Sequence, residues 1–145
     1  MSNPTCATLS IGLCHSETLT VAARHTVPEV EPAWPGFADM PPVLATAMMI
    51  GFVEQTCIEG LRPFLSAEQR TVGTHVDVSH IAPTPVGMTV TATVELIGIE
   101  GKALLFKVQC RDEGGVIGEG THRRAIIDLS RFTQRLQEKA AQAGN

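Results

Sequence analysis

The sequence of 145 residues has few aromatic residues and no long run of basic or apolar residues. Five Phe, one Trp and no Tyr leave the core to be built from aliphatic side chains. The net charge of −4, without a Lys/Arg cluster, excludes the basic stripe of a nucleic-acid-binding protein. The longest apolar run, residues 43–53, is interrupted by Thr46 and Gly51 and is too short to span a bilayer. We therefore expect neither nucleic acid nor a membrane as a partner.

The sequence also lacks the usual signatures of metal binding and secretion. The five histidines show no HxxxH or HExxH spacing, which argues against a metal site. Residues 1–8 lack the basic region and apolar stretch of a signal peptide. The four cysteines form no CxxC pair and match no zinc-site spacing; they are Cys6, Cys14, Cys57 and Cys110. We expect a cytoplasmic protein with reduced thiols and no metal.

The composition, 43% apolar and 18% charged, predicts one folded domain over residues 1–145, with residues 1–10 loose. A first strand is predicted over residues 13–27. Residues 28–42 contain five prolines and are predicted to form a long ordered loop, because proline removes hydrogen-bond donors. A loop of this length in a small domain is often a lid over a site.

The longest helix is predicted over residues 43–61. Pro41 and Pro42 lie at its entrance, where proline is tolerated, and Pro63 stops it. The segment is apolar on most sides, which is typical of a buried helix. Two polar residues inside it, Thr46 and Glu54, call for an explanation.

After this helix the apolar residues recur with period two. The pattern predicts four strands in an antiparallel meander, over residues 71–81, 88–99, 102–111 and 116–129. In the second of these, Val90, Ala92, Val94 and Leu96 are expected on one side. Gly118 and Gly120 indicate a bulge or a close backbone approach in the last strand. A C-terminal helix over residues 130–143 is expected to be capped by Ser130.

One apolar helix beside one twisted antiparallel sheet predicts an α+β domain in which the sheet wraps around the long central helix. This arrangement is the hotdog fold. Such a sheet leaves one edge unpaired, and we therefore expect two subunits to join as a dimer.

Glu54 is the first candidate for chemistry, because a carboxylate on an inner helix is costly unless it is paired or used. It is either a general base or nucleophile, or a structural contact at a dimer seam or helix end. Thr46 either caps the helix or positions water or substrate. Eight residues of helix rise about 12 Å. Thr46 therefore lies in a loop that folds back, or the two residues reach the site separately, in different subunits.

His80 ends the strand predicted over residues 71–81 and can transfer a proton near neutral pH. His75 is its rival on the same strand, but the opposite parity places the two side chains on different faces. Weaker candidates are His15, His25 and His122. Gly73 lets the backbone approach a ligand, and its N–H could bind a carbonyl oxygen.

These residues lie in stretches that together resemble the fluoroacetyl-CoA thioesterase group of hotdog enzymes. The stretches are Phe37 to Glu54, Gly73 to His80, Ala82 to Val90, and Gly120 to Ile127. The resemblance implies that Thr46, Glu54 and His80 form a catalytic triad and that the Gly73 backbone contacts the substrate carbonyl.

By the same resemblance, Arg124 holds the CoA portion of the substrate, and residues 28–42 form the lid. Phe37 retains an aromatic of the acyl pocket, whereas Met40 stands where the fluoroacetate-specific enzyme has a gating Phe. This difference predicts a relative with another acyl preference.

The sequence therefore predicts a hydrolase that cleaves the thioester of a small acyl-CoA to the free acid and CoA, without a cofactor, as a homodimer or a higher oligomer. Two alternatives remain open. One is a hotdog enoyl-CoA hydratase or dehydratase that uses Asp39 and His80. The other is a non-catalytic module that binds acyl-CoA.

Overall fold

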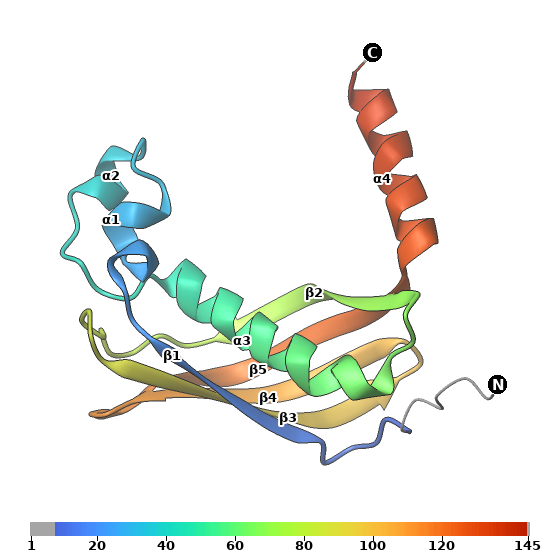
Figure 1. Cartoon of the computed structure of the whole chain (residues 1–145), viewed down its shortest axis with the longest axis horizontal. Helices are drawn as coiled ribbons and strands as arrows, with labels where there is room; N and C mark the ends of the chain where they lie inside the picture. Colours follow the sequence, from blue (N-terminus) through green and yellow to red (C-terminus); the bar gives the residue numbers. More distant parts are fainter. Residues whose placement is uncertain (1–7, 145) are drawn as a thin grey trace.

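A curled five-stranded antiparallel sheet surrounds one long helix in the computed structural model, which describes residues 8–144 (Figure 1). Residues 1–7 of the segment predicted to be loose lie outside the described part. The helix, α3, spans Thr46–Leu61 and ends in the short helix η2 (Arg62–Phe64). The strands are β1 (Cys14–Thr20), β2 (Gln69–Val78), β3 (Thr89–Glu100), β4 (Ala103–Asp112) and β5 (Gly115–Asp128).

The order of strands across the sheet is β1-β3-β4-β5-β2. The predicted meander is therefore correct for β3, β4 and β5 but wrong for β2, which pairs with β5 at the far edge. The glycines of β5 permit this pairing. A side chain at Gly118 would collide with the backbone oxygen of Ser79, and one at Gly120 with that of Asp77. The expected close backbone approach at these two glycines is confirmed.

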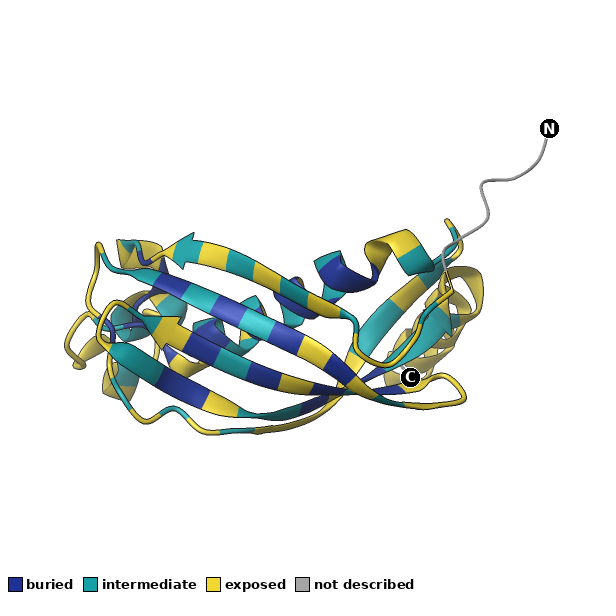
Figure 2. Ribbon diagram, turned by 90° about the horizontal axis from the view of Figure 1, so that it is seen from below, coloured by how far each residue is buried: buried dark blue, intermediate teal, exposed yellow. Residues whose placement is uncertain are grey.

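The core lies between the concave face of the sheet and one face of α3. The alternation along β3 is as predicted, because Val90, Ala92, Val94 and Leu96 are all buried. Figure 2 shows this alternation of buried and exposed residues along the strands. The buried apolar stripe of α3 recurs every four residues, which is one face of a helix: Met49, Val53, Cys57 and Leu61. Each large side chain buried here contributes about 1.5–3 kcal/mol.

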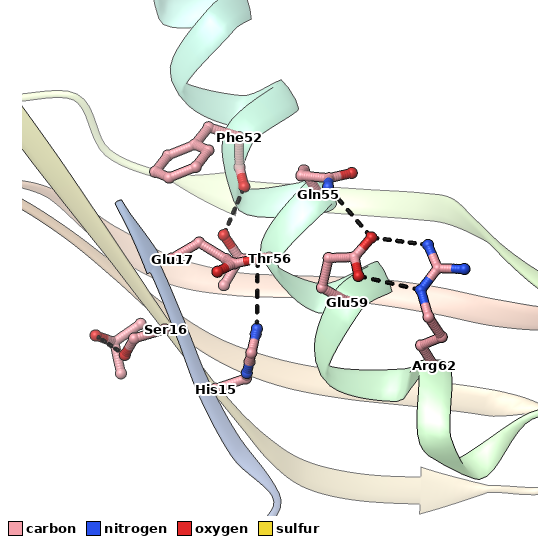
Figure 3. A network of polar contacts seen from close by, with 9 residues as sticks. His15, Ser16, Glu17, Phe52, Gln55, Thr56, Glu59 and Arg62 are labelled. Atoms are coloured by element: carbon pink, nitrogen blue, oxygen red, sulfur yellow. Dashed lines mark hydrogen bonds and ion pairs between the residues drawn. The ribbon is translucent and has the colours of Figure 1, made fainter. Parts of the chain in front are cut away.

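α3 is apolar on most sides, as predicted, because Met48, Ile50 and Phe52 are partly buried and pack against the same core. Exposed polar side chains lie towards its C-terminal end, where the Glu59 carboxylate accepts hydrogen bonds from Gln55 and Arg62 (Figure 3). The Arg62 Nη2–Glu59 Oε1 distance is 2.7 Å, and the Arg62 side chain is 68% exposed. Solvent screens such a pair, and its contribution to stability is small.

The segment between β1 and α3 differs most from the prediction. The strand predicted to reach residue 27 ends at Thr20, and a short helix η1 (Ala23–His25) follows. The predicted loop contains two one-turn helices, α1 (Val27–Val30) and α2 (Pro35–Ala38), each with proline in its first two positions. Proline has the φ of a helix start, so it begins these turns where we expected irregular chain. Both helices lie beyond the N-terminal end of α3 (Figure 1).

Two helix starts also differ from the prediction. α3 begins at Thr46 and not at residue 43, because Val43 and Leu44 form isolated β-bridges with Pro85 and Thr26. The C-terminal helix α4 (Leu129–Ala143) is capped by Asp128, whose side chain accepts a hydrogen bond from the Arg131 N–H. The expected cap at Ser130 was wrong by two residues. No helix in residues 8–144 is long and apolar enough to cross a membrane.

Candidate active site

The first residue of α3 and a histidine just beyond β2 form a hydrogen-bonded pair. Thr46 Oγ1 and His80 Nδ1 are 2.7 Å apart. Pairing with β5 continues past the end of β2, because the N–H groups of Ser79 and Ile81 donate to Glu119 and Ile117. His80 is therefore held in an extended segment and not in a free loop. The structure brings together two of the three residues predicted for the triad.

The second ring nitrogen of His80, Nε2, is buried and has no hydrogen-bond partner among the described residues. A buried nitrogen without a partner is uncommon and is found at catalytic groups. Burial lowers the pKa of His80 below its ordinary value, and the backbone of Ala82 acts in the opposite direction. The imidazole is therefore neutral near pH 7, so it can accept a proton.

A pocket of about 440 Å³ opens beside Thr46. Its lining is mostly apolar and combines the lid segment with the start of α3: Val27, Gly36, Phe37, Met40, Ala45, Thr46 and Ala47. The Phe37 ring packs edge-on against Trp34, with ring centroids 5.1 Å apart. Phe37 and Met40, both predicted to contact the acyl group, therefore lie in the wall of a pocket that ends at Thr46.

Glu54 forms an ion pair with a buried arginine, whereas the arginine that pairs with Glu59 is exposed. Arg124 Nη1 is 2.8 Å from Glu54 Oε2; the Arg124 side chain is 2% exposed and that of Glu54 38%. Removing the partner of a buried charge costs about 3–5 kcal/mol. Arg124 lies beneath the Glu54 carboxylate and not at the surface; the contact with the CoA portion that the resemblance implies stays a prediction.

The other donors of Arg124 also bind protein groups. Its Nε donates to Thr71 Oγ1 and its Nη2 to the Thr71 carbonyl, both at 2.9 Å. Gly73 lies against the same cluster. A side-chain carbon built on Gly73 would be 2.6 Å from Glu54 Oε2 and 3.2 Å from a ring carbon of His122. Glycine at this position therefore makes room for the Glu54–Arg124 pair.

The Glu54–Arg124 pair and the Thr46–His80 pair are separate within one chain. Thr46 and Glu54 lie eight residues apart on one unbroken helix, which corresponds to a rise of about 12 Å. Within residues 8–144, no hydrogen bond or ion pair joins Glu54 to Thr46 or His80. The alternative in which Thr46 lies in a loop that folds back is wrong, because Thr46 is helical.

The remaining candidates have other surroundings. The His75 side chain is exposed, whereas His25 is buried and accepts a hydrogen bond from the Ala22 N–H. On β1, His15 Nε2 lies 3.6 Å from Glu17 Oε1, on the side of the strand that faces α3 (Figure 3). No group of three or more His, Cys, Asp or Glu side chains in the described part of the chain could hold a metal ion. A groove of about 370 Å³ at the other end of α3 contains Arg62 and Arg70 but none of the predicted site residues.

Known proteins are similar to this chain in sequence and in fold. A sequence profile of the fluoroacetyl-CoA-specific thioesterase family matches residues 21–130. The fluoroacetyl-CoA thioesterase of Streptantibioticus cattleyicolor is 37% identical over 131 residues, which are 90% of this chain and 94% of that protein. This chain belongs to the fluoroacetyl-CoA-specific thioesterase family. The resemblance found in the sequence motifs is confirmed.

Solved structures agree with this assignment. A structure of a fluoroacetyl-CoA thioesterase superposes with a TM-score of 0.88 at 37% identity, covering 90% of this chain and 97% of that one. A hot-dog-like protein from Thermanaerovibrio acidaminovorans has a TM-score of 0.76 at 22% identity, covering 89% and 91%, and supports the fold alone. The predicted hotdog fold of this family member is confirmed.

Two further residues belong to the Arg124 cluster: Thr71, which was not selected from the sequence, and His122, which was only a weaker candidate. The strand pattern contains a signal that groups them with Arg124. His122 and Arg124 are two apart on β5, Thr71 and Gly73 are two apart on β2, and Gly73 pairs with Arg124 in the register. Residues two apart share a face of a strand, so one pairing places all four together. That pairing depends on β2 lying beside β5, which the predicted meander missed.

Proposed function

We propose that this protein hydrolyses the thioester of a small acyl-CoA to the free acid and CoA, with Glu54, Thr46 and His80 as its catalytic residues. The observation that carries the proposal is the Thr46–His80 hydrogen bond, because Thr46 also lines an apolar pocket. Family membership supplies the reaction class. The three described cysteines are free, which agrees with action in the cytoplasm. The reaction needs no cofactor, because these side chains supply both the acid–base and the nucleophilic groups.

The acyl group occupies the pocket between the lid and the start of α3, in this proposal. The thioester carbonyl then lies near the N-terminal end of α3. The N–H groups of Thr46 and Ala47 have no acceptor within the helix, and the positive end of the helix dipole favours developing negative charge. The Gly73 backbone of a second subunit is the further donor that the family resemblance implies.

Glu54 is suited to act on that carbonyl because its two oxygens have different surroundings. Oε2 accepts a hydrogen bond from Arg124, while Oε1 has no hydrogen-bond partner among the described residues. The buried guanidinium stabilises the carboxylate charge. Arg124 therefore positions Glu54 in our proposal. Oε1 is the oxygen that attacks the thioester or takes a proton from water.

The two pairs come together if the catalytic site is shared between subunits. β2 is an edge strand of ten residues; Val76 on this strand is 45% exposed, and Ile81, three residues beyond its end, is 69% exposed. An unpaired edge of this kind invites a second copy. Antiparallel pairing of two β2 strands about a point between Val76 and Asp77 places Gly73 of one subunit opposite His80 of the other. Glu54 lies against Gly73. A homodimer therefore completes two sites.

The reaction then has two routes that use the same placement. Glu54 Oε1 either attacks the thioester carbon to form an anhydride, which water hydrolyses, or removes a proton from the water that attacks. In both routes the C–S bond breaks with loss of the CoA thiolate, a leaving group that needs little acid help. In the first route His80 takes the proton from the water that hydrolyses the anhydride; in the second it takes from Glu54 the proton that Glu54 has removed from water. In both it returns this proton to the thiolate, and the Thr46 hydroxyl orients its ring.

The hydratase alternative lacks support in the geometry. Asp39 is exposed at the end of α2, and no hydrogen bond joins it to His80 within residues 8–144. The ring nitrogen that a carboxylate would orient, His80 Nδ1, is bonded to Thr46. A module that only binds acyl-CoA would give the Glu54 carboxylate no chemical role.

A thiol-release assay on a panel of short acyl-CoA esters tests the function. We expect release of free CoA from at least one ester with saturation kinetics. Binding of CoA esters without thiol release would instead identify a non-catalytic module, and hydration of crotonyl-CoA would identify a hydratase.

Met40 is expected to determine acyl preference, because its half-exposed side chain lines the acyl pocket. Met40→Phe narrows this pocket, and one methylene of misfit changes selectivity by about 10- to 200-fold. We expect the ratio of kcat/KM for butyryl-CoA to that for acetyl-CoA to fall at least about tenfold, while the affinity for free CoA stays constant. Leu136→Phe on α4 is the control. An unchanged ratio in Met40→Phe would contradict the proposal that this pocket holds the acyl group.

A further inference from the structure

A buried imidazole stands directly behind the Glu54–Arg124 pair. The His122 side chain is on β5, two residues before Arg124 and on the same face of the strand, and the residue is 1% exposed. Its Nδ1 is 2.7 Å from the carbonyl oxygen of His75, and its Nε2 is 3.2 Å from Arg124 Nη1. The register of β2 shifts between Gly73 and His75, which turns the His75 carbonyl toward this ring.

The partners of His122 fix its protonation state. A carbonyl oxygen can only accept a hydrogen bond, so Nδ1 carries a proton and donates it to His75. A guanidinium can only donate, so Nε2 is unprotonated and accepts from Arg124. Both partners are satisfied by the neutral tautomer with hydrogen on Nδ1. Burial lowers the pKa of His122 and outweighs the hydrogen bond to the His75 carbonyl, which raises it; Arg124 lowers this pKa further and Glu54 raises it.

The neutral acceptor matters for the orientation of Arg124. The Nη1 atom carries two hydrogens, and its two acceptors are Glu54 Oε2 and His122 Nε2. Together with the two bonds to Thr71, these contacts hold the guanidinium plane from α3, β5 and β2. A carboxylate in place of His122 would compete with Glu54 for the positive charge. A neutral imidazole accepts one hydrogen bond from Arg124, and the positive charge of the guanidinium stays paired with the Glu54 carboxylate.

We propose that His122 is a positioning residue of the thioesterase site, which fixes Arg124 so that Glu54 presents Oε1 to the substrate. The inference rests on the proposed function for its kinetic consequence and on the hydrogen bonds alone for its structural part. His122 acts through Arg124 and does not itself contact the substrate.

The kinetic test compares three substitutions at residue 122. The amide oxygen of glutamine reaches the place of Nε2, while the shorter asparagine reaches only that of Nδ1. We expect His122→Leu to lower kcat at least about tenfold, as loss of an outer-shell partner does at metal sites. KM changes less. His122→Gln should retain more of kcat than His122→Asn. Equal values for Gln and Asn, or a higher value for Asn, contradict the proposal, and this comparison stands even if the Leu variant does not fold.

A double-mutant cycle separates positioning from general damage to the fold. If His122 acts through Glu54, then His122→Leu has no further effect on the residual rate of the Glu54→Gln variant. An equal loss in both backgrounds overturns the proposal. His15→Leu, the same change at an imidazole on β1 away from the site, is the control and leaves kcat unchanged.

Nitrogen NMR of the imidazole tests the structural part without any assay of activity. Long-range proton–nitrogen correlations on the wild-type protein should assign His122 to the neutral form with hydrogen on Nδ1. The opposite tautomer or a charged ring overturns the inference. If this NMR signature is present but no acyl-CoA is hydrolysed, the proposed function fails and the hydrogen-bond assignment stands.

Discussion

Glu54→Gln is expected to lower kcat for acyl-CoA hydrolysis by about 10²- to 10⁴-fold, the range for loss of a general acid–base group. The reason is that an amide can neither attack a thioester usefully nor take a proton from water. Glutamine keeps an oxygen that can accept the hydrogen bond from buried Arg124, so the fold should persist. Thiol release measures the rate, and circular dichroism with thermal melting checks the fold.

Glu59→Gln is the matched control for this prediction. Glu59 is on the same helix and also pairs with an arginine, but that arginine is largely exposed (Figure 3). We expect Glu59→Gln to leave kcat unchanged. Turnover near the wild-type value in Glu54→Gln would show that the carboxylate has a structural role alone.

His80→Ala is expected to cause a loss of kcat of similar size, about 10²- to 10⁴-fold, because it removes both the proton carrier and the partner of the Thr46 hydroxyl. The pKa of His80 lies below its ordinary value of 6.5, because the ring is partly buried. The neutral imidazole is the active form. The wild-type kcat/KM should therefore be constant near pH 7 and fall only as the pH drops below about 6.5.

The control for His80 is His15→Ala on β1, which should preserve both the rate and its pH dependence. If His80→Ala keeps the wild-type rate, or if kcat/KM falls with rising pH between about 5 and 7, His80 is not the base of this reaction.

The long helices and the strands β3, β4 and β5 could be predicted from the sequence, whereas the pairing of β2 could not. Periodicity placed β3 and β4 within one residue of their ends, since alternation is a property of each strand by itself. The position of β2 beside β5 is a non-local choice. It depends on the glycines of β5. The sequence indicated a bulge or a close backbone approach at these glycines, but not which strand approaches them.

The candidate site was predictable to a similar degree. Thr46 and His80 were expected together from the family motifs and lie within hydrogen-bond distance. The partner of Glu54 was missed, because Arg124 enters the site through the β2–β5 register and β2 was expected elsewhere. The same error hid Thr71 and the place of His122 beside Arg124. Proline in residues 28–42 was interpreted as a sign of irregular chain, although two of those prolines begin helical turns.

The central claim is that Glu54 of one subunit acts with Thr46 and His80 of the other. Mixed dimers of Glu54→Gln and His80→Ala subunits, purified with two different tags, test it most directly. A shared site leaves one complete set of residues per mixed dimer, so the account predicts about half of the wild-type turnover per dimer, although each parent is inactive. A mixed dimer as inactive as its parents would contradict it.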